Sequence, residues 1–255
     1  MSEDHKHRAR IFLHRGDLVH ARSAWEAAIA DDRAANDQRE LSDSLGNLGN
    51  TCALMHDFET AERCYREVLG IQRTERNQHA VAHTLVNLGN LHIGADHPEK
   101  ARPYYLEALD LLRDLKDDRA LGILYNNLAL QEAREGQWEQ AVTSFKLALD
   151  YHRVVGNEEG LAVTYSQLGK CFLDQGDLTN AERCLNNASE HYIKLGNEPA
   201  EAAVLRLLAT IYEARHDRLS ARRCLERTVA LDLRYQLSEF RQDSARLASL
   251  TDPSS

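Results

Sequence analysis

The feature that most constrains the fold is a tetrapeptide that recurs at intervals of forty residues. Residues 47–50 read Asn-Leu-Gly-Asn, and residues 87–90 repeat them letter for letter. Related tetrapeptides stand at residues 127–130, 167–170 and 207–210. A fixed period of about 20 to 50 residues indicates an array of stacked supersecondary units, not a single globular core.

A second pattern lies between these tetrapeptides and indicates a second helix in each repeat. An alanine recurs at Ala21, Ala61, Ala101, Ala141, Ala181 and Ala221. A large apolar residue follows four positions later, at Trp25, Tyr65, Tyr105, Phe145, Leu185 and Leu225, and a small or β-branched residue three positions after that. Steps of four and three place these residues on one helical stripe, so each repeat is predicted to be a pair of helices.

Short turns separate the predicted helices and contain Asp or Asn residues suited to N-capping. These residues are Asp17, Asp37, Asp57, Asn77, Asp117, Asn157, Asp177, Asn197 and Asp217. Glycines Gly49, Gly89 and Gly169 recur inside the first helix of a repeat. Because glycine costs a helix up to about 1 kcal/mol relative to alanine, its repetition predicts close helix contact there.

The predicted fold class is all-α, an α-α solenoid of six helix-turn-helix repeats with a terminal capping helix. The repeats are assigned to residues 1–37, 38–77, 78–117, 118–157, 158–197 and 198–237. The capping helix is assigned to residues 238–250, and residues 251–255 are expected to form a frayed tail. The first helix carries Arg8 where other repeats carry leucine, so it is predicted to be a polar end cap.

The pattern Leu48-Gly49…Ala61…Tyr65 resembles the tetratricopeptide repeat family, and the resemblance covers residues 3–231. The period of forty residues and the Asn-Leu-Gly-Asn motif are similar to kinesin light chains, spindle-orientation adaptors and Rap-type bacterial regulators. This resemblance implies a right-handed superhelix whose concave wall, formed by the first helices, binds peptides or partner helices. It implies no catalysis and no cofactor.

The charge and hydropathy of the sequence limit the classes of partner that the protein is expected to bind. A formal net charge of −9 argues against binding to a nucleic-acid backbone, which requires clustered Lys and Arg. No apolar run is long enough to cross a membrane, and the N-terminal residues lack the apolar core of a signal peptide. We therefore expect a cytoplasmic protein whose ligand is another protein or a peptide.

The resemblance also implies where a ligand would lie along the first helices. The implied groove residues are Asn47, Asn50, His83, Val86, Asn87, Asn90, Ile123, Asn126, Asn127, Leu130, Arg134, Gln167, Lys170 and Arg206. Asn47, Asn87, Asn127 and Gln167 would form a ladder of primary amides, which can bond both the N–H and the C=O of a peptide backbone. The alternative is that these amides only bond neighbouring helices or turns.

Other candidate sites are less well supported. Arg215, Arg218, Arg222, Arg223 and Arg227 form a basic cluster that fits either an acidic partner or a solvated helix face. His79 and His83 have helical i, i+4 spacing but no companion carboxylate or cysteine of a zinc motif. The five cysteines fit packing better than a disulfide framework. The sequence contains no phosphate-binding loop and no nucleophile motif of the kind that would indicate an enzyme.

The sequence therefore predicts a scaffold or adaptor that recognises an extended or helical segment of a partner in its groove. Two alternatives stay open. The chain could be a structural scaffold that associates with its own copies, forming a homo-oligomer, or it could be a peptide-sensing regulatory domain.

Overall fold

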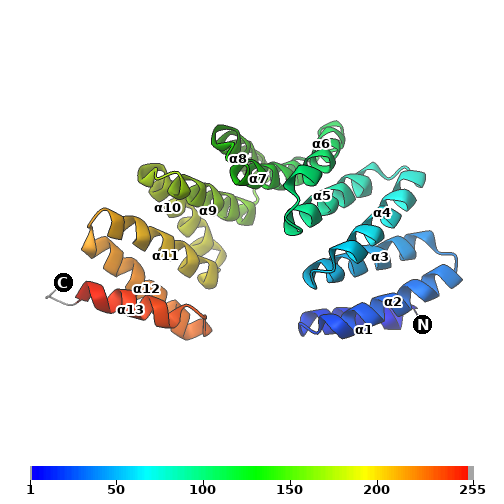
Figure 1. Ribbon diagram of the computed structural model, residues 1–255, viewed down its shortest axis with the longest axis horizontal. Coiled ribbons are helices and arrows are strands. Elements are labelled where there is room, and N and C mark those ends of the chain that lie inside the picture. The colour runs from blue at the N-terminus through cyan, green and yellow to red at the C-terminus, as the bar shows by residue number, and fades with distance from the viewer. Residues whose placement is uncertain (1, 252–255) are drawn as a thin grey trace. The chain divides into compact units, whose positions relative to one another are not determined.

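The computed structural model describes residues 2–251, and every regular element in this range is an α-helix (Figure 1). The helices are α1 (Ser2–His14), α2 (Leu18–Ala34), α3 (Gln38–Leu54), α4 (Phe58–Thr74), α5 (Gln78–Gly94), α6 (Pro98–Leu115), α7 (Asp118–Arg134), α8 (Trp138–Val154), α9 (Glu158–Asp174), α10 (Leu178–Leu195), α11 (Glu198–Ala214), α12 (Arg218–Tyr235) and α13 (Phe240–Thr251). The all-α prediction is thus confirmed. Of the predicted frayed tail, residues 252–255 lie outside the described part.

The chain divides into two compact units, Met1–Leu124 and Tyr125–Ser255, with the division inside α7. In the first unit, the helices from α1 to α6 pack in sequential order, from α1 against α2 to α5 against α6. In the second unit, the helices from α8 to α13 pack in the same sequential way. Within each unit, consecutive helices run antiparallel, as Figure 1 shows. The contacts are therefore local in sequence, as stacking of helix pairs requires.

The alanine stripe forms the buried seam of each helix pair. The six recurrent alanines, from Ala21 to Ala221, are completely buried. The large residues four positions later are also buried, with exposed fractions from 0 % to 4 %. Burial of one large apolar side chain contributes about 1.5–3 kcal/mol, so the seam is the main source of stability in each pair.

The recurrent glycines lie where two helices approach most closely. A Cβ atom added to Gly49 would lie 2.8 Å from Cε1 of Tyr65, and one added to Gly89 would lie 2.2 Å from Cε1 of Tyr105. Each glycine therefore makes room for the aromatic ring of the second helix in its own pair. This confirms the predicted close contact.

The helix ends repeat with a period of twenty residues. All nine predicted Asp and Asn caps accept a hydrogen bond from the backbone N–H three residues later. Each such cap contributes about 1 kcal/mol. The residue immediately before each cap position has a left-handed backbone, with φ between 54° and 77°. Seven of these twelve residues are not glycine: Asn36, His56, Arg76, Asp96, Lys116, His216 and Gln236.

The cysteines are all free, and four of the five are buried. Burial raises the pKa of Cys64, Cys184 and Cys224 to about 11, which keeps their thiols protonated at neutral pH. They pack as small apolar side chains.

The first helix pair encloses a charged cluster. Nζ of Lys6 lies 3.2 Å from Oδ2 of Asp32 and also donates to Glu40, and Lys6 and Asp32 are only 2 % and 3 % exposed. Burial acts to raise the pKa of Asp32. Hydrogen bonds from Ser2, Ser44 and Lys6 outweigh it, so this pKa lies below its ordinary value.

Candidate functional site

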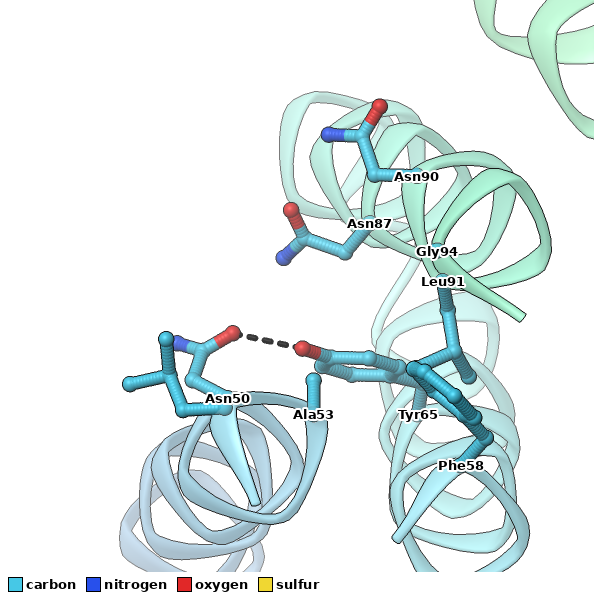
Figure 2. A pocket seen from close by; sticks show the side chains of 9 residues that line it. Asn50, Ala53, Phe58, Tyr65, Asn87, Asn90, Leu91 and Gly94 are labelled. Carbon is cyan, nitrogen blue, oxygen red and sulfur yellow. Dashed lines mark hydrogen bonds between the residues drawn. The ribbon is translucent and has the colours of Figure 1, made fainter. Parts of the chain in front are cut away.

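A cleft of about 390 Å³ opens in the first unit between the helices α3, α4 and α5 (Figure 2). Its lining residues are Asn50, Ala53, Leu54, Phe58, Tyr65, Asn87, Asn90, Leu91 and Gly94. Three of the predicted groove residues, Asn50, Asn87 and Asn90, thus line one cleft. Its wall combines carboxamides with apolar and aromatic side chains.

The last asparagine of each Asn-Leu-Gly-Asn motif binds the second helix of its own pair. The Tyr65 hydroxyl donates to Oδ1 of Asn50 at 2.6 Å, and the Tyr105 hydroxyl donates to Oδ1 of Asn90 at 2.6 Å. Burial raises the pKa of Tyr65 to about 12, so the hydroxyl keeps its proton for this bond. The oxygen of each of these two carboxamides therefore joins the first helix of the pair to the second helix, and the amino group takes no part in this bond.

The sequence contains a signal for this bond that our sequence analysis missed. The partners stand fifteen residues apart, and Asn50 and Asn90 occur in the two repeats that carry Tyr65 and Tyr105. In the repeat with Phe145, which has no hydroxyl, the equivalent first-helix residue is Leu130. The asparagine and the tyrosine therefore change together.

The first asparagine of the motif differs between the two repeats of this unit. Asn47 donates from Nδ2 to the backbone carbonyl of Asp43 in its own helix at 2.8 Å. Asn87, in contrast, is half-buried, and its side-chain carboxamide makes no hydrogen bond with any residue in the described range. Figure 2 shows its carboxamide extending from α5 into the space beside Asn50 and Tyr65.

The second unit contains a cleft of about 540 Å³ in the same register. Its lining residues are Leu130, Ala133, Arg134, Trp138, Phe145, Gln167, Lys170, Cys171 and Asp174. Each of them stands eighty residues after a residue that lines the first cleft. Four further predicted groove residues, Leu130, Arg134, Gln167 and Lys170, are thereby brought together.

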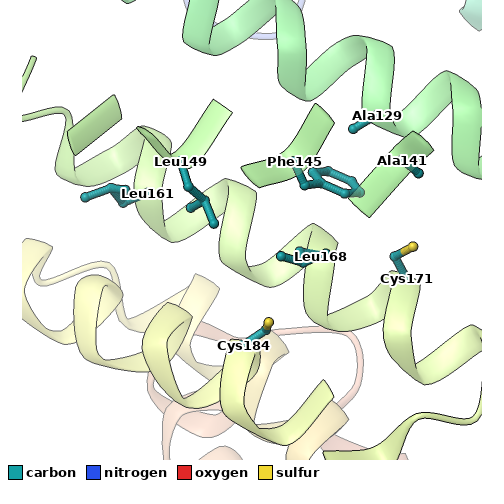
Figure 3. Packing of buried hydrophobic residues seen from close by; sticks show 8 residues of the cluster. All are labelled: Ala129, Ala141, Phe145, Leu149, Leu161, Leu168, Cys171 and Cys184. Carbon is teal, nitrogen blue, oxygen red and sulfur yellow. The ribbon is translucent and has the colours of Figure 1, made fainter. Parts of the chain in front are cut away.

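The floor of the second cleft belongs to a buried cluster of α7, α8, α9 and α10. Phe145 is completely buried and Cys171 is 4 % exposed, and Figure 3 shows both among the apolar side chains of this cluster. Gln167 is the counterpart of Asn87, and its Oε1 atom is buried without a hydrogen-bond partner in the described structure. The same register position thus presents a carboxamide to both clefts, and it has a buried oxygen without a partner only in the second cleft, at Gln167.

The remaining predicted groove residues do not line either cleft. His83 and Ile123 are exposed, Val86 and Asn127 are half-buried, and Asn126 is only 7 % exposed. The Oδ1 atom of Asn126 has no hydrogen-bond partner among the described residues.

Arg206 is held inside the last helix pairs, not presented to a ligand. Its guanidinium donates to Asp232 of α12 and to Asp243 of α13, which are 0 % and 1 % exposed. Burial raises the pKa of Asp232; the Arg206 charge opposes this rise, and the hydrogen bond with Asp243 adds to it. The α13 helix thus provides an intramolecular acidic partner for this predicted groove residue.

The basic cluster on α12 and the turn before it is also largely paired within the chain. Arg215 pairs with Glu182, Arg222 with Glu226, and Arg227 with Glu201. These pairs favour the interpretation of a solvated helix face over a site for an acidic partner.

Among the described residues, no group of three His, Cys, Asp or Glu side chains is placed to hold a metal ion. His79 lies beside Asp117, with Nδ1 at 3.5 Å from Oδ2. None of the helices in the described range is long and apolar enough to cross a membrane.

Paired antiparallel helices, repeated seam alanines and recurrent clefts define a helix-pair repeat protein. The sequence profile of the tetratricopeptide repeat matches residues 40–114, 120–178 and 160–234, and the chain belongs to the tetratricopeptide repeat family. Proteins of this family are typically non-catalytic, and membership supports a protein-interaction scaffold in general terms. A search of the curated proteins finds no match to this chain.

Solved structures share the fold at low sequence identity. BtubC (BKLC) from P. vanneervenii is 20 % identical with a TM-score of 0.77, covering 86 % of this chain and 92 % of that one. A signal-transduction ATPase with numerous domains and a tetratricopeptide repeat sensor, from Pyrococcus horikoshii, is 16 % identical with a TM-score of 0.78, covering 95 % and 37 %. A Rap protein solved with competence and sporulation factor is 14 % identical with a TM-score of 0.69, covering 96 % and 73 %.

Proposed function

We propose that this protein is a scaffold or adaptor that binds an extended or helical segment of a partner protein along its first helices. The observation that carries the proposal is the recurrence of one cleft in both units, each lined by a carboxamide with unused hydrogen-bonding capacity. This carboxamide belongs to Asn87 in the first cleft and to Gln167 in the second.

The buried Oε1 atom of Gln167, which has no hydrogen-bond partner among the described residues, favours a peptide ligand for an energetic reason. A polar group that is withdrawn from water without a partner costs about 1–3 kcal/mol, and a ligand that supplies the partner recovers this cost. A peptide backbone offers both N–H and C=O groups at regular spacing, which match the two functions of a carboxamide. The apolar side chains beside Asn87, such as Phe58 and Leu91, would contact the ligand's side chains.

The proposal is tested by selecting peptides of about twelve residues from a random display library on the immobilised protein and measuring their affinity by calorimetry. Loss of one ligand hydrogen bond weakens binding by about threefold to tenfold. We expect this loss for Asn87→Ala or Gln167→Ala, and no change for Gln140→Ala on the exposed side of α8. Selected peptides that bind both cleft variants as tightly as the wild type would contradict the proposal.

Self-association remains a second candidate because aliphatic side chains are exposed near the ends of three second helices in the second unit. Val154, Ile193 and Leu233 are 74 %, 59 % and 67 % exposed. Large apolar side chains exposed to this degree favour contact with another protein surface. Light scattering tests this candidate: a mass that rises with concentration, and that returns to the monomer in a Val154→Ser, Ile193→Ser, Leu233→Ser variant, would support it.

A peptide-sensing role is the narrower form of the same proposal. Its support is the fold likeness to the Rap protein whose structure contains competence and sporulation factor. A change in hydrogen exchange outside the two clefts upon binding of a selected peptide would distinguish sensing from passive binding.

A further inference from the structure

The two clefts occupy the same register but differ in the chemistry of their walls. The position of Leu54 in the first cleft is taken by Arg134 in the second, and that of Asn90 is taken by Lys170. The first cleft has no charged lining residue, whereas the second has two cations and one anion, Asp174. A chain with a formal net charge of −9 thus presents a cleft wall with an excess of positive charge.

The two cations of the second cleft are not engaged by the chain itself. Arg134 and Lys170 are exposed, and neither lies within ion-pair distance of a carboxylate in the described residues. Other arginines of the same unit are paired, for example Arg215 with Glu182 and Arg246 with Glu213. The fold thus leaves the cleft cations available.

An aromatic surface lies beside these cations. Trp138 takes the position of Phe58 and is 36 % exposed at the start of α8, and it lines the same cleft as the buried ring of Phe145. An indole ring binds apolar or aromatic groups with a large contact area, and its N–H group can also donate a hydrogen bond. The second cleft therefore combines an apolar platform with a positive rim and the carboxamide of Gln167.

We propose that the cleft of the second unit binds an acidic segment of the partner. An Asp or Glu side chain of this segment pairs with Arg134 and Lys170, and an adjacent apolar side chain packs on Trp138. The inference rests on the proposed function, because it assumes that peptides bind in the clefts. It assigns charge selection to the second cleft alone, while the first cleft binds without preference for charge.

Trp138 provides a direct reporter of occupancy. The chain has two tryptophans, and the other one, Trp25, is 1 % exposed inside the first helix pair. A ligand in the second cleft will therefore change the fluorescence of Trp138, and the Trp138→Phe variant will lose this change. The probes are synthetic peptides taken from the random library selected on the wild type.

The decisive comparison is between two double variants that remove the same charge. In the cleft variant, Arg134→Gln and Lys170→Gln, affinity for acidic peptides falls about tenfold, as removal of two exposed ion pairs predicts. The control variant, Lys146→Gln and Lys194→Gln, changes exposed lysines that line neither cleft and keeps wild-type affinity. Binding to the wild type weakens as salt is added, because salt screens exposed charges. Circular dichroism confirms that each variant is folded.

The outcomes separate this inference from the proposed function. Enrichment of Asp and Glu in the selected peptides, with loss of binding in the cleft variant only, supports both. Peptides without such enrichment, or equal binding to the cleft variant and the wild type, overturn the inference and leave the proposed function standing. Selection of no peptide at all by the wild type overturns both.

Discussion

The first and last helix pairs hold a cation against a buried carboxylate at the same two register positions, but the number of buried acids around the cation differs. Lys6 and Asp32 recur 200 residues later as Arg206 and Asp232. In the first pair, Asp32 is the one acid that is almost fully buried against the cation. In the last pair, Arg206 forms ion pairs with two such acids, because Asp243 of α13 is buried beside Asp232.

The four pairs between them hold no Lys, Arg, Asp or Glu at these two positions, so the repeat does not require a Lys/Arg–Asp pair there. The residues are Gly46 and Gln72, Val86 and Leu112, Asn126 and His152, and Ser166 and Tyr192. A buried charge is thus not a requirement of the repeat. Where one is present, its effect on stability depends on whether the charges balance.

The largest effect on the free energy of unfolding is expected from removing the charge of Lys6, the cation buried in the first pair. Lys6→Met leaves Asp32 buried without its counter-charge, which costs about 3–5 kcal/mol. Urea unfolding will measure the loss, with Arg8→Met on the exposed side of α1 as the control. A loss no greater than in the control would mean that water reaches Asp32 and that the cluster is not a buried pair.

Neutralising the acids one at a time tests the comparison more sharply. Asp32→Asn removes a charged hydrogen-bond acceptor and is expected to cost about 2 kcal/mol. Asp232→Asn removes the acid whose charged form is disfavoured by the fold, so stability is expected to stay level or to rise. Thermal unfolding of both variants at pH 7 measures the difference in sign. Equal losses would show that the excess acid in the last pair is not strained.

The two ends are also expected to respond oppositely to pH. The pKa of Asp32 is lowered, so its stabilisation is present above the ordinary value near 3.8 and is lost as pH falls through the lower folded value. The pKa of Asp232 is raised, so its favourable protonated form is present below 3.8 and is lost as pH rises through the higher folded value.

Acidification from pH 7 towards pH 4 will therefore close the stability gap between Asp232→Asn and the wild type, and leave the gap of Asp32→Asn unchanged. The gap closes because acidification protonates Asp232 in the wild type and so removes the charged form that the fold disfavours. Thermal unfolding across this pH range checks the prediction. A gap that closes for Asp32→Asn instead would reverse our assignment of the two ends.

The smallest effect compares the turns that follow the two buried aspartates. Asn36 and Gln236 both have φ of 54°, but asparagine adopts the left-handed conformation more readily than glutamine. Gln236→Gly is expected to stabilise the protein by about 1 kcal/mol, and Asn36→Gly by only a few tenths. Thermal unfolding of the two variants measures the difference. A larger gain for Asn36→Gly would indicate that its side chain is strained.

The fold was predictable from the sequence because the recurrent residues act locally. Each seam alanine, each capping aspartate and the glycine at Gly89 indicates a contact inside one helix pair or one turn. Because these residues recur every forty residues, the same contact is indicated in several repeats. The left-handed residues were harder to predict, since Arg76 and Lys116 give no sign of that backbone conformation.

The candidate site was predictable only in part. The resemblance placed Asn87 and Gln167 on the first helices, and the structure brings both to the walls of clefts. The resemblance did not reveal that the Tyr65 hydroxyl donates to Asn50, although asparagine and tyrosine change together between repeats. It also did not reveal that Arg206 donates to Asp243, because that partner stands 37 residues away and is brought there by the packing of the helices. Which partner segment enters the clefts stays a proposal.

The twenty-residue spacing of the left-handed turn residues has a consequence for how such a chain can evolve. Because equivalent turns share a left-handed residue that ends one helix before the next begins, recombination between two such turns removes or adds forty residues without creating a new kind of junction. The number of clefts is thereby open to change by duplication, while the chemistry of each cleft can diverge by point substitution, as Leu54 and Arg134 illustrate. A ligand of a different length or charge is thus within reach of a few genetic events.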